Sequence, residues 1–265
     1  MRRALEGDDL PDERVEEWLR GALATFEQLA SNDPRTIACA TAYASFLQNH
    51  ARFDEAHAVL DRAVVATQKL FGDELATDML RRYARLEFAR GNFASAEMIS
   101  RQSVAHELRR WAAKRADEAP RLRSIAQRVE QPGAPSAEPP FADAFAELRR
   151  LEGDGSFELA QWMNGIAAVL RAQDRGNATE PLLREALHIR CRALGSDCPV
   201  RQRTIEMLAE QLLHERRGDE AVELLEESLQ TFERQGAAGS AEAGRASELL
   251  VACRENAASS TTSAR

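Results

Sequence analysis

The chain has 265 residues, of which 44% are hydrophobic and 29% charged, an ordinary balance for a protein that can bury a core. Its formal net charge of -8 provides no global basic field, which argues against nucleic-acid binding. No run approaches the roughly 18 apolar residues of a membrane span, and Met1 to Leu10 has no apolar core of a secretory signal. We therefore expect a cytoplasmic protein that makes no membrane contact.

The first predicted element is an amphipathic helix over residues 15–30. Its apolar stripe consists of Trp18, Ala22, Leu23, Phe26 and Leu29. Ala22 precedes the equivalent Ala63 by 41 residues, which makes this helix the second helix of a repeat whose first helix is missing. The sequence leaves open whether the array begins with half a repeat or the chain was cut from a longer protein.

Four later segments share one pattern, in which small residues recur at three places on both sides of a polar turn. The first small residue of each segment is Ala44, Ala84, Ala167 or Ala209, so the spacing is 40 residues in the first pair and 42 in the second. Small side chains let two antiparallel helices approach closely where they cross. The pattern predicts helix hairpins at about 36–72, 75–117, 157–199 and 200–235.

The stretch between the two pairs of hairpins is irregular. Short helices are expected at 121–129 and 141–151. Gln131 to Pro140 contains four prolines, which cannot continue a helix and favour an extended, semi-rigid segment. The sequence leaves open whether this stretch is a degraded repeat or a domain linker.

A last helix near residues 241–256 has one apolar face and suits the cap of a repeat array. The residues after it are polar and predict a disordered tail. The expected organisation is an N-terminal block of a half repeat and two repeats, a proline-rich linker with a degraded repeat helix, a C-terminal block with its capping helix, and the tail. These parts cover residues 1–130, 131–156, 157–258 and 259–265.

Residues 180–199 read EPLLREALHIRCRALGSDCP. This segment resembles the long, kinesin-light-chain type of tetratricopeptide repeat, whose pattern is E-P-L-x-x-x-A-L-x-I-x-x-x-x-L-G-x-D-H-P. Only the loop histidine is replaced, by Cys198. The resemblance implies an all-α fold, a right-handed α-solenoid of antiparallel helix hairpins that forms a superhelix of the tetratricopeptide-repeat type.

The hairpin turns depart from the family pattern. The glycine expected after the first helix is Ala51, Asp174 or Arg216 in three of the four copies. The aromatic residue two positions later, present as Phe53 and Phe93 in the first two copies, is glycine in the later two, at Gly176 and Gly218. The two halves therefore resemble distinct subfamilies, and the second is expected to be less rigid at its turns.

In that family the first helices line a concave groove, at positions fixed relative to the small residue. Carried over, these positions predict a partner-binding groove formed by Thr41, Ser45, Gln48, Asn49, Arg81, Arg85, Phe88, Asn164, Arg171, Glu206, Glu210 and His214. Arg81 and Arg85 are four residues apart, so they share a helix face that suits an acidic peptide. Lys69 and Lys114 are the only lysines, and an arginine excess beside so much alanine is typical of the codon usage of a GC-rich bacterial genome, which weakens the case for this pair.

Enzyme signatures are absent from the sequence, including the phosphate-binding loop, the dinucleotide fingerprint, the zinc-protease motif and the nucleophile elbow. His50 and His57 could approach each other across a turn, but a coherent zinc site needs about four ligands. We therefore expect a non-catalytic scaffold that binds a peptide or protein segment, without metal or cofactor. Two alternatives stay open: the regulatory or sensor region of a larger bacterial signalling enzyme such as a Ser/Thr kinase, and an enzyme with a closed pocket. The sequence does not determine the oligomeric state.

Overall fold

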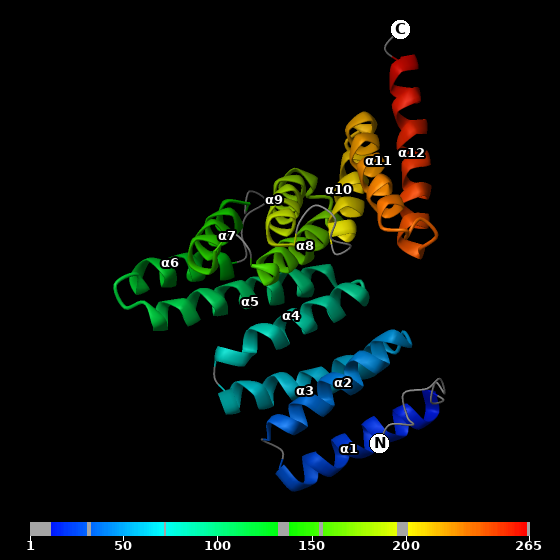
Figure 1. Cartoon of the computed structure of the whole chain (residues 1–265). Helices are drawn as coiled ribbons and strands as arrows, with labels where there is room; N and C mark the ends of the chain where they lie inside the picture. The colour runs from blue at the N-terminus through cyan, green and yellow to red at the C-terminus, as the bar shows by residue number, and fades with distance from the viewer. Residues whose placement is uncertain are drawn as a thin grey trace. The chain divides into compact units, whose positions relative to one another are not determined.

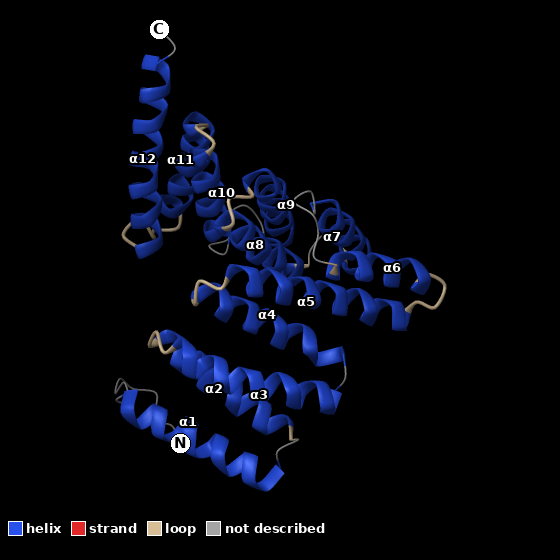
Figure 2. Ribbon diagram, turned by 180° about the vertical axis from the view of Figure 1, so that it is seen from behind, coloured by secondary structure: helices blue, strands red, loops and turns tan. Residues whose placement is uncertain are grey.

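The computed structural model describes residues 12–30, 33–71, 73–131, 138–153, 156–194 and 201–263. Within these ranges the protein forms helices and no strand (Figures 1 and 2). The helices are α1 (Asp12–Ala30), α2 (Pro34–Asn49), α3 (Phe53–Phe71), α4 (Asp73–Ala89), α5 (Phe93–Lys114), α6 (Ala119–Glu130), α7 (Glu138–Glu152), α8 (Phe157–Ala172), α9 (Gly176–Leu194), α10 (Gln202–His214), α11 (Gly218–Arg234) and α12 (Ala241–Ser263). The all-α fold predicted from the sequence is confirmed.

Contacts between helices divide the chain into two compact units, Met1–Gln131 and Pro132–Arg265, here named unit 1 and unit 2. Unit 1 contains α1 to α6 and unit 2 contains α7 to α12. In each unit, helices that follow one another along the chain pack side by side. The division falls at the first proline of the proline-rich segment.

The four predicted hairpins are α2–α3 and α4–α5 in unit 1 and α8–α9 and α10–α11 in unit 2. The first small residue of each copy, Ala44, Ala84, Ala167 or Ala209, is at most 6% exposed. Small side chains at these buried positions allow neighbouring helices to approach closely.

Local sequence signals set the starts of α2 and α8. Asp33 lies before α2, and its carboxylate accepts a hydrogen bond from the backbone N–H of Arg35 at 2.8 Å, while Pro34 occupies the first helical position. Ser156 precedes α8 in the same way, and its hydroxyl accepts from the backbone N–H of Leu159 at 3.2 Å. These caps satisfy donors that have no partner inside the helix.

All four hairpin turns adopt one conformation, although only one of them contains glycine. The backbone angle φ is +57° at Ala51, +79° at Gly91, +57° at Asp174 and +61° at Arg216. In each turn the N–H of the next residue donates to the carbonyl five residues earlier, at 2.8–3.0 Å. This is the hydrogen bond of a Schellman motif, which ends a helix through one left-handed residue. The four turns therefore share one geometry whether or not glycine holds the left-handed position.

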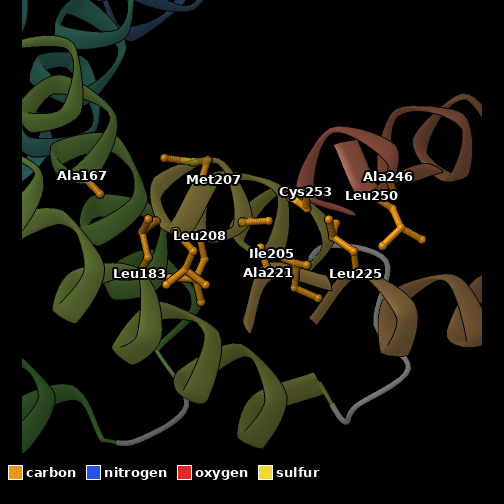
Figure 3. Close-up of a cluster of buried hydrophobic side chains, with 12 residues drawn as sticks. Ala167, Leu183, Ile205, Met207, Leu208, Ala221, Leu225, Ala246, Leu250 and Cys253 are labelled. Atoms are coloured by element: carbon orange, nitrogen blue, oxygen red, sulfur yellow. The ribbon is translucent and has the colours of Figure 1, made fainter. Parts of the chain in front are cut away.

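Each unit has its own hydrophobic core. In unit 1, a cluster that includes Leu23, Leu47, Leu60 and Leu86 joins α1 to α4, and each of these side chains is at most 4% exposed. In unit 2, a cluster joins α8 to α12, with Leu183, Leu208, Leu225 and Cys253 completely buried (Figure 3). Helix α12 therefore covers the end of the unit 2 core, as a capping helix should.

Two details of the structure differ from the sequence prediction. Trp18, predicted within the apolar stripe of the first helix, is 61% exposed. Val59, which holds the equivalent position 41 residues later, is 6% exposed because other helices pack on α3. Helix α12 continues to Ser263, so residues 259–263 are helical where a disordered tail was predicted; no Gly or Pro there ends the helix.

Several predicted features lie outside the described residues, namely the segment before Asp12, the proline-rich residues 132–137 and the loop motif at 195–199. Among the helices that are described, none is both long enough and apolar enough to cross a membrane.

Candidate functional site

Five of the predicted groove residues converge on one pocket in unit 1. Thr41, Ser45, Gln48 and Asn49 of α2 and Arg85 of α4 all line it, and its volume is about 120 Å³. In the first helix of each hairpin, the residues one, four and five positions after the small residue lie on the same side of the helix. Ser45, Gln48 and Asn49 hold these positions in α2, and Arg85 holds the first of them in α4. The spacing carried over from the repeat family thus brings these five side chains together.

A larger and more apolar pocket lies next to the first, with a volume of about 480 Å³. The two pockets share Thr41, Ser45 and Arg82, so we treat them as one surface and name it the α2–α4 groove. The additional lining of the larger pocket comes from Pro34, Ile37, Ala38, Ala42, Thr67, Asp78 and Met79. The groove therefore combines an apolar floor with charged groups at its edge.

One carboxylate and three guanidinium groups set the charge at this edge. Asp78 forms ion pairs with Arg81 and with Arg82, whose Nε lies 3.0 Å from Asp78 Oδ2. Burial alone would raise the pKa of Asp78, but the hydrogen bond from Arg82 and the charges of both arginines outweigh it and lower this pKa. Arg85 is exposed and forms no ion pair with any described residue. Arg85 is therefore available to a partner, whereas Arg81 is already paired.

The other two predicted residues of unit 1 do not line the groove pockets. Arg81 is held by Asp78, as described above. The ring of Phe88 packs against that of Phe93 with 5.4 Å between their centroids, which joins α4 to α5 across the turn.

In unit 2, three predicted residues surround a second pocket. Arg171 of α8 and Glu210 and His214 of α10 line a space of about 270 Å³. The guanidinium of Arg171 forms an ion pair with the carboxylate of Glu210, so these two charges largely neutralise each other. Asp174, Gly176 and Gln211 complete the lining.

Asn164 and Glu206, also predicted for the groove, are buried, with 8% and 3% exposure. The side-chain amide of Asn164 donates to the hydroxyl of Thr204 at 2.8 Å and so links α8 to α10. Glu206 forms ion pairs with Arg203 at 3.4 Å and with Arg245 of α12 at 3.6 Å. We assign both side chains to helix packing, because a partner cannot reach them without displacing these contacts.

Residues 159–199, which include nearly all of α8 and the whole of α9, match the family model for the tetratricopeptide repeat. This segment is a tetratricopeptide repeat. The match confirms the resemblance inferred from residues 180–199 of the sequence. No curated protein matches the chain.

The chain is similar to several solved helical structures, to different degrees. BtubC (BKLC) from P. vanneervenii is similar with a TM-score of 0.53 and 16% identity, over 86% of this chain and 93% of that one. The assembly chaperone of RpL4 (Acl4) gives 0.47 and 16%, over 96% and 93%. The TPR2AB domain of yeast Sti1 in its pHSP90 complex gives 0.32 and 12%, over 91% and 99%. Only the first of these comparisons has a TM-score above 0.5, and at 16% identity it supports the fold alone.

His50 and His57, the histidines that could approach each other across the α2–α3 turn, bind different carboxylates. His50 Nε2 lies 3.0 Å from Asp12 Oδ2, and this hydrogen bond is the main reason that the pKa of His50 is raised. His57 Nδ1 lies 3.0 Å from Glu87 Oε1. Among the described residues, no group of three His, Cys, Asp or Glu side chains is placed to hold a metal ion.

The family pattern alone did not identify every residue that lines the pockets of the two units. It omitted Arg82, although the spacing of four from Asp78 predicts their ion pair. It also omitted Gln211, for which the sequence offers no signal. Gly176 did carry a signal, because a glycine replaces the aromatic residue found at Phe53 in the first copy.

Proposed function

We propose that this protein is a non-catalytic interaction scaffold whose unit 1 holds an extended segment of a partner protein in the α2–α4 groove. The observation that carries the proposal is the convergence of five side chains from α2 and α4 on one pocket, with the unpaired Arg85 among them. A tetratricopeptide match in the same chain supports the assignment to an interaction protein.

The charges at the groove favour an acidic segment. Arg82 and Arg85 line the groove and carry two positive charges, and Asp78 supplies one negative charge. This local excess of positive charge stands out in a chain whose net charge is -8. A carboxylate of the partner would approach Arg85, because a guanidinium offers two parallel donors to a carboxylate.

The other lining residues suit a backbone and a short apolar side chain. Thr41, Ser45, Gln48 and Asn49 provide hydroxyl and amide groups that can bind the peptide groups of an extended segment. Ile37 and Met79 provide apolar surface in the larger pocket beside them. We place the protein in the cytoplasm as part of this proposal; Cys39, Cys191 and Cys253 are free thiols, which suits a reducing compartment.

The test is affinity purification from the native organism with mass spectrometry, using the wild-type chain and the variant Arg85→Glu. We expect the variant to lose the partners that wild type captures, because a carboxylate at position 85 repels an acidic segment. Arg123→Glu is the matched control, since Arg123 is an exposed arginine of α6 and lies outside the groove. Equal capture by all three proteins would refute groove binding at Arg85.

A further inference from the structure

The pocket between α8 and α10 in unit 2 lies beside a position at which the two units differ in sequence. Gly176 holds the position at which the first copy has Phe53 and the second has Phe93. A Cβ added at Gly176 would lie 2.5 Å from the side-chain nitrogen of Gln211. The amide of Gln211 therefore uses the space that even a methyl group at position 176 would need, and the turn end of the hairpin keeps a polar pocket of about 270 Å³. We name it the Gln211 pocket.

The side-chain carbonyl oxygen of Gln211 accepts no hydrogen bond from the described residues. Its Nε2 donates to Glu215 Oε1 at 2.6 Å, which fixes which end of the amide is the nitrogen. Its Oε1 is buried and has no hydrogen-bond partner among the described residues, and the whole side chain is 0% exposed. A buried carbonyl oxygen without a donor is unfavourable, and a ligand N–H that reaches it would supply the missing hydrogen bond to an acceptor that has already lost its hydration.

The charged groups of the pocket favour a cation. Asp174 is exposed at the left-handed turn position and forms no ion pair with the described residues. Arg171 is already neutralised by Glu210 and so offers no free positive charge. His214 is exposed and completes the lining on the α10 side. An anion would meet the carboxylate of Asp174 and the free oxygen of Gln211, whereas a cation would be attracted by both.

We propose that the Gln211 pocket binds the basic side chain of a partner segment, with its N–H groups donating to Asp174 and to Gln211 Oε1. Arginine fits best, because its planar group can donate to a carboxylate and to a second acceptor at once. The inference rests on the proposed scaffold function, since Arg171, Glu210 and His214 hold groove positions. It adds that unit 2 selects the charge opposite to the one that the α2–α4 groove selects.

The binding test is an NMR titration of the full chain with two short blocked peptides that differ only in a central arginine or glutamate. The arginine peptide should shift the backbone amide signals of Asp174 and Gly176 and the side-chain amide of Gln211, with saturation, and the glutamate peptide should not. Equal shifts with both peptides, or no saturable shift, would overturn the proposal. Ethylguanidinium is the third probe; if it binds as tightly as the peptide, the pocket takes a free small cation and the partner assignment is wrong.

Two variants separate binding from folding. Gln211→Leu removes the unpaired acceptor. It introduces the residue type that α4 has at the equivalent position, where the leucine is Leu86. We expect this variant to unfold at an equal or higher temperature, yet to bind the arginine peptide about tenfold more weakly, as does Asp174→Asn. Asp219→Asn, which removes an exposed carboxylate of α11 outside the pocket, is the control.

Unchanged affinity in both pocket variants would refute the inference. Arg85→Glu should leave the arginine peptide bound, because Arg85 belongs to unit 1. A failure of the Gln211 pocket is therefore distinguishable from a failure of the α2–α4 groove.

Discussion

The carboxylate of Glu87 accepts a hydrogen bond from His57, with 3.0 Å between Oε1 and Nδ1, and this contact joins the first repeat of unit 1 to the second. Glu87 is 3% exposed, and it also accepts from Arg90 at 2.7 Å and from Asn92 at 3.0 Å. Arg90 in turn reaches Asp54 of α3 at 2.7 Å. One buried carboxylate thus organises the junction between α3, α4 and the turn after α4.

Glu87→Gln tests this junction. The variant keeps the shape of the side chain but removes the charge that balances Arg90, so we expect unit 1 to lose about 1–3 kcal/mol of unfolding free energy. Urea denaturation followed by circular dichroism measures the loss. Glu158→Gln, an exposed residue of α8 in unit 2, is the control and should change stability little. An unchanged midpoint for Glu87→Gln would mean that the network contributes no net stability.

The same carboxylate predicts the direction of the pH dependence. Burial alone would raise the pKa of Glu87, but hydrogen bonds from Arg90 and Asn92 outweigh it and lower this pKa below the ordinary value of 4.5. A carboxyl with a lowered pKa in the folded state stabilises the fold above about pH 4.5, and this contribution is lost as the pH falls further. Denaturation curves between pH 3 and pH 7 should show the loss, with a shallower decline in Glu87→Gln. Equal slopes in both proteins would contradict the assignment.

The hairpin turns predict a stabilising glycine. Ala51 has a φ of +57°, which an L-residue adopts only at a cost of about 1–2 kcal/mol. Ala51→Gly removes this cost but increases the freedom of the unfolded chain, so a net gain of about 0.5–1 kcal/mol is expected. Ala58→Gly, at an exposed position inside α3, is the matched control and should lose about as much. Urea midpoints that move in the same direction for both variants would contradict the left-handed turn.

The exposure of Trp18 gives a further test. Trp18→Ser should change the unfolding free energy by less than about 0.5 kcal/mol, because the ring is 61% exposed. Leu23→Ala on the same helix should cost about 2–4 kcal/mol, because Leu23 is buried in the unit 1 cluster. A large loss in Trp18→Ser would show that another segment covers the ring in solution. Thermal and urea unfolding of the two variants and wild type measure the difference.

Features that depend on residues close in the sequence could be predicted without the structure. The spacing of Ala44, Ala84, Ala167 and Ala209 placed all four hairpins, because helical periodicity and short turns are local properties of the chain. The same spacing brought Thr41, Ser45, Gln48 and Asn49 to one pocket, since these positions share a face of α2.

Partners that lie far apart in the sequence were decided only by the tertiary structure. Arg171 and Glu210 are 39 residues apart, and they neutralise each other because α8 and α10 lie close enough for the ion pair. Glu206 is buried and forms an ion pair with Arg245 of α12, 39 residues later, which no pattern in α10 indicates. The sequence by itself determined the repeats and their helix hairpins, and its resemblance to a known repeat family supplied the list of groove positions. Packing between helices determined which of those positions stay open to a partner, because burial and ion pairing depend on neighbours in space.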